Sequence, residues 1–247
     1  MRAQRQRQLR NRIIVGVVLA AVVLGLVYLT SRGGSGKKGT AASTTTTAVA
    51  PTTPTTEAAA GKIGTQECPK ADGSSPQTRS FDGEPKTCID PAKTYTATIE
   101  TDAGTMKATL DPKAAPKTVN NFVVLARYHF FDGLSFHRVI PGFVLQGGDP
   151  QGNGNGGPGY KFADELPQAG QYKVGSLAMA NSGPNTNGSQ FFVIAGDQGV
   201  ALPPNYSLFG QVTEGLDVVH KIEADGAADP NPPKVVHKMT KVTITES

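Results

Sequence analysis

The sequence predicts a mainly β domain with two helices, in which short strands form a closed antiparallel sheet. A single N-terminal transmembrane helix and a disordered linker are expected to precede this domain. Short alternating segments separated by Gly and Pro turns begin near residue 95, and they indicate the sheet. An uncharged apolar run, Ile13–Leu29, indicates the transmembrane helix. Residues 31–66 consist mostly of Gly, Ser, Thr, Ala and Pro, which is typical of a linker.

Two kinds of periodicity define the expected elements. Apolar and polar residues alternate over Thr94–Glu100 and Thr105–Leu110, and the turn residues between these segments indicate a hairpin. Apolar residues recur at helical spacing over Lys117–Arg127. The further expected elements are a helix at Leu216–Ile222 and strands at Phe136–Val139, Phe143–Gly147, Gly175–Ala180, Gln190–Ala195, Ser207–Val212 and Val242–Thr245. Many short strands with two helices favour a closed antiparallel sheet.

Charge is distributed unevenly along the chain. Residues 1–38 hold eight of the 24 Lys and Arg residues and no Asp or Glu. The remainder therefore carries 16 basic against 20 acidic residues, a net charge of −4. A nucleic-acid-binding domain would carry its basic residues on the folded part. We therefore expect no nucleic-acid partner.

Residues 13–30 are expected to anchor the chain in a membrane. The apolar run has the minimum length for a bilayer core, and the basic tail of residues 1–12 favours a cytoplasmic N-terminus. A cleaved signal peptide is the alternative, but its apolar core is usually shorter, and Tyr28–Arg32 makes a poor cleavage site. The predicted location is the cell membrane, single-pass, with the rest of the chain on the extracytoplasmic side.

The segment between the anchor and the domain divides into two parts. Residues 31–66 are expected to be a disordered tether, because this composition cannot bury enough apolar surface to fold. Residues 67–92 form an extension flanked by Cys68 and Cys88. Since export favours oxidation, we expect these cysteines to form a disulfide, with free thiols as the alternative. Neither has a second Cys or a His at ligand spacing, so no metal site is expected.

Two segments carry the candidate chemistry: residues 136–149, FHRVIPGFVLQGGD, and residues 179–192, MANSGPNTNGSQFF. Strand alternation places Arg138 on one face, and a bend at Pro141-Gly142 can bring Phe143 and Gln146 to the same hollow. Gln190 and Phe192 are two residues apart, so on a strand they face the same side. One cation, two aromatic rings and two amides would then border a shared site.

Both segments closely resemble the two signature stretches of cyclophilins, and the resemblance runs from about Tyr95 to Glu246. It implies an eight-stranded β-barrel capped by helices over residues 93–247, with no cofactor. The implied activity is peptidyl-prolyl cis/trans isomerisation of proline-containing polypeptides. Arg138 would be the catalytic residue, donating a hydrogen bond to the prolyl nitrogen as the amide twists. The implied substrate-binding residues are Phe143, Val144, Gln146, Ala180, Asn181, Gln190, Phe192, Leu202 and Tyr206.

The sequence departs from many eukaryotic cyclophilins on the rim of the implied pocket. It contains no Trp, whereas those relatives often have one just before the leucine that matches Leu202. Tyr206 stands where they often have a histidine. Both features resemble the bacterial, membrane-anchored variety and weaken the expectation of tight cyclosporin binding.

Three features have alternative interpretations. His137 lies next to Arg138, but alternation turns it to the opposite face, so we expect a buried structural histidine. Residues 152–157, GNGNGG, match a dinucleotide-binding spacing, but Pro158-Gly159 follows where a helix is required, so we expect a loop. A non-catalytic proline-peptide binding module, or a scaffold at the membrane, is the alternative function. A monomer is expected.

Overall fold

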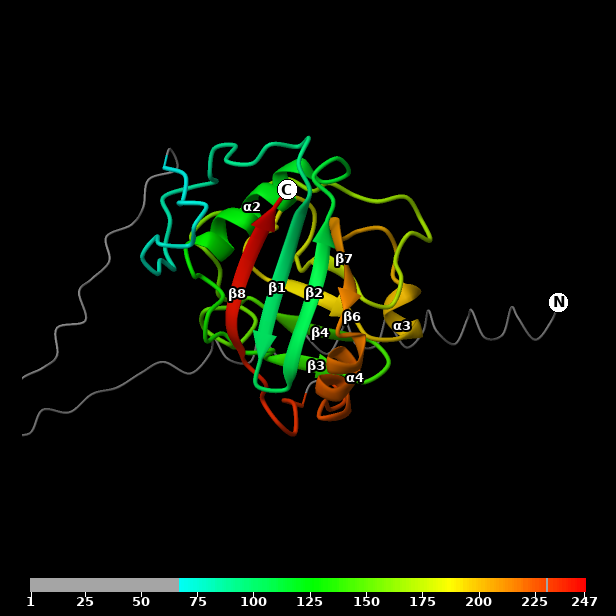
Figure 1. Cartoon of the computed structure of the whole chain (residues 1–247). Helices are drawn as coiled ribbons and strands as arrows, with labels where there is room; N and C mark the ends of the chain where they lie inside the picture. Colours follow the sequence, from blue (N-terminus) through cyan, green and yellow to red (C-terminus); the bar gives the residue numbers. More distant parts are fainter. Residues whose placement is uncertain (1–66, 230) are drawn as a thin grey trace, which may run out of the picture. The chain divides into compact units, whose positions relative to one another are not determined.

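The computed structural model describes residues 67–229 and 231–247. Eight strands form one sheet in the order β3-β4-β6-β5-β7-β2-β1-β8, and every neighbouring pair is antiparallel (Figure 1). The expected eight-stranded antiparallel sheet is confirmed. The predicted transmembrane segment and linker lie outside the described residues. Among the helices of the described ranges, none is long and apolar enough to cross a bilayer.

The elements follow the order of the sequence. The strands are β1 Tyr95–Thr101, β2 Gly104–Leu110, β3 Arg138–Ile140, β4 Val144–Gly147, β5 Ser176–Met179, β6 Phe191–Ile194, β7 Leu208–Glu214 and β8 Met239–Glu246. The helices are α2 Pro116–Arg127, α3 Asp197–Val200 and α4 Leu216–Ala224. The prediction of two helices was wrong, because α3 is a third. Its four residues are too few to show a helical period in the sequence.

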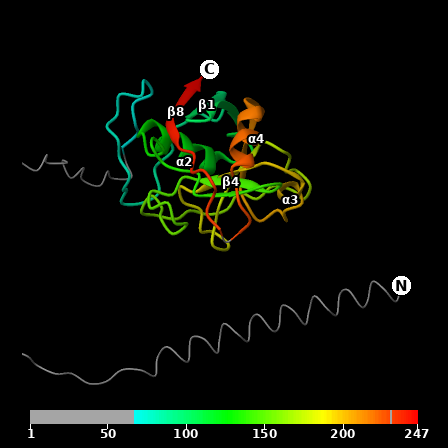
Figure 2. The same cartoon turned by 90° about the horizontal axis from the view of Figure 1, so that it is seen from below.

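The two ends of the sheet are not joined by a strand ladder. Within the described residues, β3 and β8 are edge strands of the sheet. The connection is made by the segment before β3 and by the start of β8 with the residues before it, because the Phe136 N–H donates to the His237 carbonyl at 2.9 Å and the Met239 N–H to the Leu134 carbonyl at 2.8 Å. The expected closed sheet is therefore corrected to an open one, whose edges meet through these few hydrogen bonds. In Figure 2, β1 and β8 lie on one side and β4 on the other.

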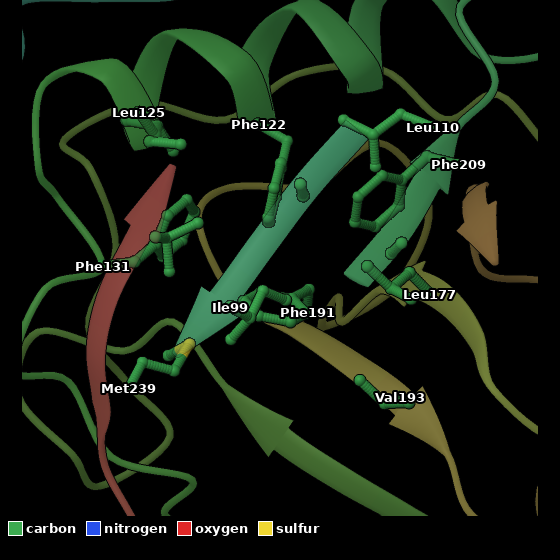
Figure 3. Close-up of a cluster of buried hydrophobic side chains, with 14 of the residues drawn as sticks. Ile99, Leu110, Phe122, Leu125, Phe131, Leu177, Phe191, Val193, Phe209 and Met239 are labelled. Atoms are coloured by element: carbon green, nitrogen blue, oxygen red, sulfur yellow. The ribbon is translucent and has the colours of Figure 1, made fainter. Parts of the chain in front are cut away.

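The core fills the space between the sheet and α2. Phe122 of α2 is 1% exposed and meets three other aromatic rings, those of Phe131, Phe191 and Phe209, at centroid distances of 4.9, 5.4 and 5.2 Å (Figure 3). On β6, Phe191 and Val193 point into this core, so strand alternation turns Phe192 and Ile194 to the outer face. The inner face supplies stability, and the outer face is available for a site.

The extension of residues 67–92 packs against the domain formed by the sheet and its helices. Phe81 and Ile89 are buried in the main core, and the Phe81 N–H donates to the Pro158 carbonyl at 2.9 Å. The predicted disulfide between Cys68 and Cys88 is present. The extension is therefore stabilised both by the covalent cross-link and by burial of apolar side chains.

A carboxylate from a distant loop caps the start of α2. Ala115 at the N-cap offers no side-chain hydrogen bond. Glu165 instead accepts hydrogen bonds from the N–H groups of Lys117 and Thr118, at 3.0 and 2.8 Å, and from the Thr118 hydroxyl at 2.8 Å. Its negative charge also lies at the positive end of the helix dipole.

We expect Glu165→Ala to lower the free energy of unfolding by about 1–2 kcal/mol, the range for loss of a helix N-cap. Glu165→Gln keeps an acceptor and removes only the charge, so its loss should be about half as large. Urea unfolding followed by circular dichroism measures both values. Equal stability of Glu165→Ala and wild type would show that the cap contributes nothing.

His129 connects the extension to the sheet domain and should make this contact sensitive to pH. One ring nitrogen, Nε2, lies 2.8 Å from the Gly73 carbonyl, and the other, Nδ1, lies 2.9 Å from the Asp132 carboxylate. Hydrogen bonding to the Gly73 carbonyl, followed by the interaction with Asp132, raises the pKa of His129 above its ordinary value of 6.5. The stabilisation is therefore complete below the unfolded-state pKa and is lost as pH rises through the higher folded-state pKa.

We expect the melting temperature of the wild type to fall more steeply between about pH 6 and 8 than that of His129→Asn. Asn is the suitable replacement because residue 129 has a φ of 54°, which Asn tolerates better than most residues. Differential scanning calorimetry across this range makes the comparison. Parallel pH profiles would contradict the assignment.

Candidate active site

Arg138, Gln146 and Phe192 lie side by side across three strands. Arg138 of β3 is paired with Gln146 of β4, and Gln146 is paired with Phe192 of β6. Phe192 is in turn paired with Ala178 of β5. Directly opposed residues on antiparallel strands project to the same face. The register therefore brings residues that are up to 54 positions apart into one row, on the face directed away from the main core.

An apolar cluster of side chains adjoins this row. Its buried members include Val144 and Phe192, which are 1% and 4% exposed. Partly buried side chains border it, namely those of Phe143, Ala180, Leu202 and Tyr206, and all six belong to one apolar cluster that is separate from the main core. The rings of Phe192 and Tyr206 meet edge to face at 5.4 Å. The structure thus brings together every apolar residue that the resemblance implies for substrate binding.

Tyr172, which the sequence did not indicate, positions Tyr206. Its hydroxyl donates to the Tyr206 carbonyl at 2.6 Å and accepts from the Tyr206 N–H at 3.1 Å. Tyr172 is itself buried, and burial raises its pKa to about 12. It therefore stays protonated and keeps its donor. It precedes β5 in an irregular segment without periodicity, so no sequence signal could have identified this role.

A line of hydrogen-bonded polar groups lies next to the apolar cluster. The Arg138 guanidinium donates through Nη1 to Gln146 Oε1 at 3.3 Å, and Gln146 Nε2 donates to Gln190 Oε1 at 2.9 Å. Gln190 Nε2 in turn donates to the carbonyls of Gly154 and Gly156, both at 2.9 Å. Each amide is therefore held at both ends, which fixes the plane in which it can meet a peptide backbone.

The glycine-rich segment at residues 152–157 forms a loop around Asp149. The Asp149 carboxylate accepts hydrogen bonds from the N–H groups of Gln151, Asn153 and Gly154. Burial alone would raise the pKa of Asp149, but these donors lower it below its usual range. A side chain at Gly156 would place its Cβ 1.9 Å from the Asp149 carboxylate, so only glycine fits. The loop places the carbonyls of Gly154 and Gly156 where Gln190 donates to them.

A groove of about 640 Å³ continues from the row of polar residues. It is lined by Gln146, Gln190, Ala180, Asn181 and the loop around residues 154–161. The Asn181 side chain joins two loops, because it donates to the Asn205 carbonyl at 2.9 Å and accepts from the Gly183 N–H at 3.2 Å. An extended peptide could lie in this groove with its proline against the adjoining apolar cluster.

Two other features do not contribute to this site. Both ring nitrogens of His137 are buried without a hydrogen-bond partner in the described part of the chain, and burial lowers the pKa of this residue. The expectation of a buried structural histidine is met in part, because the ring nitrogens are enclosed while the residue as a whole is half-buried. A larger groove of about 870 Å³ is lined by residues 92–94, 109–114 and 165–171, among others, and by none of the predicted site residues.

Arg138 has two further contacts. Its Nη2 donates to the carboxylate of Asp229 at 2.8 Å, and its guanidinium carbon lies 5.6 Å from the centre of the Phe143 ring. The predicted aromatic partner is therefore adjacent to the cation. Asp229 was not predicted, because it lies 91 residues away in an irregular segment after α4.

Comparison with known proteins agrees with this geometry. Residues 96–244 match the family described as cyclophilin type peptidyl-prolyl cis-trans isomerase/CLD. Peptidyl-prolyl cis-trans isomerase A of Mycobacterium tuberculosis is 44% identical over 171 residues, covering 61% of this chain and 93% of the relative. Peptidyl-prolyl cis-trans isomerase B of Streptomyces anulatus is 44% identical over 166 residues, covering 60% and 92%.

A solved structure agrees as well. The crystal structure of a cyclophilin type isomerase from Cryptosporidium parvum matches with a TM-score of 0.58 and 32% identity, over 62% of this chain and 99% of that one. The same protein, in the presence of the dipeptide Ala-Pro, matches with a TM-score of 0.57. The sheet, the row of site residues and these relatives identify the chain as an enzyme, and it belongs to the cyclophilin-type peptidyl-prolyl cis-trans isomerases.

Proposed function

We propose that the enzyme accelerates X-Pro rotation in exported or envelope proteins while anchored to the cell membrane, and that Arg138 is its catalytic residue. The observation that carries the mechanism is the position of Arg138. It lies in one row with Gln146 and Phe192, next to an apolar cluster whose chemistry suits a proline ring. The proposal assigns ring binding to this cluster and backbone binding to the amides.

The reaction requires no bond to break. Rotation about a peptide bond faces a barrier of roughly 18–20 kcal/mol, because the nitrogen lone pair is delocalised into the carbonyl. Uncatalysed X-Pro exchange therefore takes on the order of tens to hundreds of seconds. A catalyst must hold both ends of the bond and favour the twisted amide over the two planar ones.

The guanidinium of Arg138 can supply that preference. In the twisted amide the nitrogen regains its lone pair and becomes a hydrogen-bond acceptor, whereas the planar amide nitrogen accepts poorly. A donor aimed at this nitrogen binds the transition state more tightly than the ground state, which raises the rate. Arg138 is held by Gln146 and Asp229 before substrate arrives, so little reorganisation is needed.

The anchor is proposed from the sequence of residues 1–30. Ile13–Leu29 is uncharged, and five arginines precede it, a combination that favours a cytoplasmic N-terminus. With this orientation the isomerase domain would meet proteins as they emerge on the far side of the membrane. A disulfide between Cys68 and Cys88 suits an oxidising compartment.

Fractionation of cells that express the full-length protein tests the anchor. We expect isomerase activity in the membrane pellet for the wild type and for Thr46→Arg/Thr47→Arg, a control that adds the same two charges outside the apolar run. The double variant Ala21→Arg/Val22→Arg should leave the pellet, since each arginine at mid-membrane costs about 2.5–3.5 kcal/mol. Wild-type protein found only in the soluble fraction would overturn the anchor.

A further inference from the structure

Asp229 is the acidic side chain bonded to the proposed catalytic arginine. Its carboxylate accepts from Arg138 Nη2 at 2.8 Å, on the side of the guanidinium away from Gln146. The side chain of Arg138 is 33% exposed and that of Asp229 is 54% exposed, so both reach the surface where a peptide would bind. This ion pair is part of the site, although Asp229 belongs to neither signature segment.

We propose that Asp229 is a positioning residue for Arg138 and that it sets the charge preference of the enzyme, cancelling the advantage that the Arg138 cation alone would give to peptides with an acidic residue beside the proline. The inference rests on the proposed function, because it assumes that Arg138 acts on the prolyl nitrogen. It extends that function by naming a substrate class.

The position of Asp229 is fixed by the strand that carries Arg138. Two residues earlier, the Ala227 N–H donates to the Val139 carbonyl at 3.0 Å. The adjoining Gly226 lies so close to β3 that an added Cβ would be 2.7 Å from the same carbonyl. The segment is also held from α4, where Glu223 accepts from the Gly142 N–H at 2.6 Å, at the turn that presents Phe143. Asp229 is therefore carried on a segment attached to both sides of the site.

Two hydrogen bonds at different nitrogens define the plane of the guanidinium. Gln146 holds Nη1 and Asp229 holds Nη2. Arginine has five N–H donors in one rigid plane, so three remain after these two contacts. Asp229 thus orients the remaining donors and does not exhaust them. Loss of this contact leaves a long side chain held mainly by Gln146 and by the Phe143 ring.

The same pair determines the charge that a substrate encounters. Asp229 brings a negative charge to the guanidinium, and the hydrogen bond from Arg138 lowers the pKa of Asp229, so the carboxylate stays ionised at neutral pH. Together they are electrically neutral. Without the carboxylate, the site would present an uncompensated cation. An acidic side chain next to the proline would then be attracted, whereas in the wild type the charge of Asp229 offsets that attraction.

Isomerase kinetics of the full-length protein with three peptides test the inference. The peptides carry Glu, Ala or Lys immediately after the proline. With the Ala peptide, Asp229→Ala should reduce kcat about fivefold and leave KM nearly unchanged, an effect of the size expected from a partly exposed ion pair. Asp229→Asn retains an acceptor for Nη2 and should restore kcat with this peptide to within about twofold of wild type.

The charged peptides separate positioning from charge preference. The ratio of kcat/KM for the Glu peptide to that for the Lys peptide should rise about fivefold in Asp229→Asn at low salt, and the rise should shrink at about 0.5 M salt. Asp217→Asn is the matched control. It removes one exposed acidic charge at the start of α4 and should leave both kcat and the ratio unchanged.

The outcomes distinguish two failures. If wild-type protein is active but both Asp229 variants match it in kcat and in the peptide ratio, the inference is overturned and the proposed function stands. If Asp217→Asn changes the ratio as much as Asp229→Asn, the preference comes from net charge and not from Asp229. An inactive wild type would overturn the proposed function and this inference together.

Discussion

Replacing Arg138 with alanine should reduce kcat/KM about 10²- to 10³-fold, the usual cost of removing one donor that stabilises a transition state. The loss should appear mainly in kcat. The apolar cluster that would bind the proline ring is formed by other residues, and Phe192 and Val144 are buried in it irrespective of Arg138. A coupled or exchange-based isomerase assay gives both constants.

Arg138→Lys is the informative companion. Lysine keeps the positive charge but has neither the planar fork nor the reach to bind Gln146 and Asp229 at once. We expect it to lose most of the activity, which would show that geometry matters beyond charge. If Arg138→Ala retains activity within about twofold of wild type, the assignment of Arg138 is wrong.

Removing the disulfide should produce the largest change in stability. The bond between Cys68 and Cys88 closes a loop with a sequence separation of 20, and loop-closure entropy for this length corresponds to about 3 kcal/mol. Phe81 and Ile89 of the extension are buried in the main core. We therefore expect the extension to unfold together with the sheet domain. The double variant Cys68→Ser/Cys88→Ser should lower the melting temperature by about 6–12 °C.

The control for this prediction is the location of the change. Amide hydrogen exchange should become faster in the core of the sheet domain as well as in residues 67–92, because both belong to one cooperative unit that has lost stability. The kcat at 25 °C should stay close to the wild-type value. An unchanged melting temperature with faster exchange confined to residues 67–92 would show that the extension opens on its own, contrary to the prediction.

Much of the fold was predictable because alternation is a local property. The hairpin of β1 and β2 and the inward and outward residues of β6 follow from a period of two. The pairing of Arg138 with Gln146 joins two consecutive strands, and the bend between them is visible in the sequence. The pairing of Gln146 with Phe192 joins strands far apart in the chain, which the sequence indicates only through the family resemblance. The closed sheet was predicted wrongly, since the contacts between its edges depend on irregular segments without a periodic pattern.

The residues that were missed share a physical feature. Each lies in an irregular segment and forms a hydrogen bond with a residue 34 to 91 positions away; they are Asp229, Tyr172 and Glu165. Their residue types give no signal in the sequence, and their roles follow only from contacts made in the folded structure. Residues within the signature segments were found because chemistry and spacing occur together in a short stretch, as with Gln190 and Phe192.

Exchange NMR of a peptide containing an Ala-Pro bond tests the central claim most directly. With wild-type enzyme we predict cross-peaks between the cis and trans signals at mixing times of about a second, far faster than uncatalysed exchange. With Arg138→Ala the peptide signals should still shift on binding, but these cross-peaks should disappear. Equal cross-peaks for both proteins would contradict the role of Arg138, and wild-type binding without any exchange would instead indicate a non-catalytic proline-binding module.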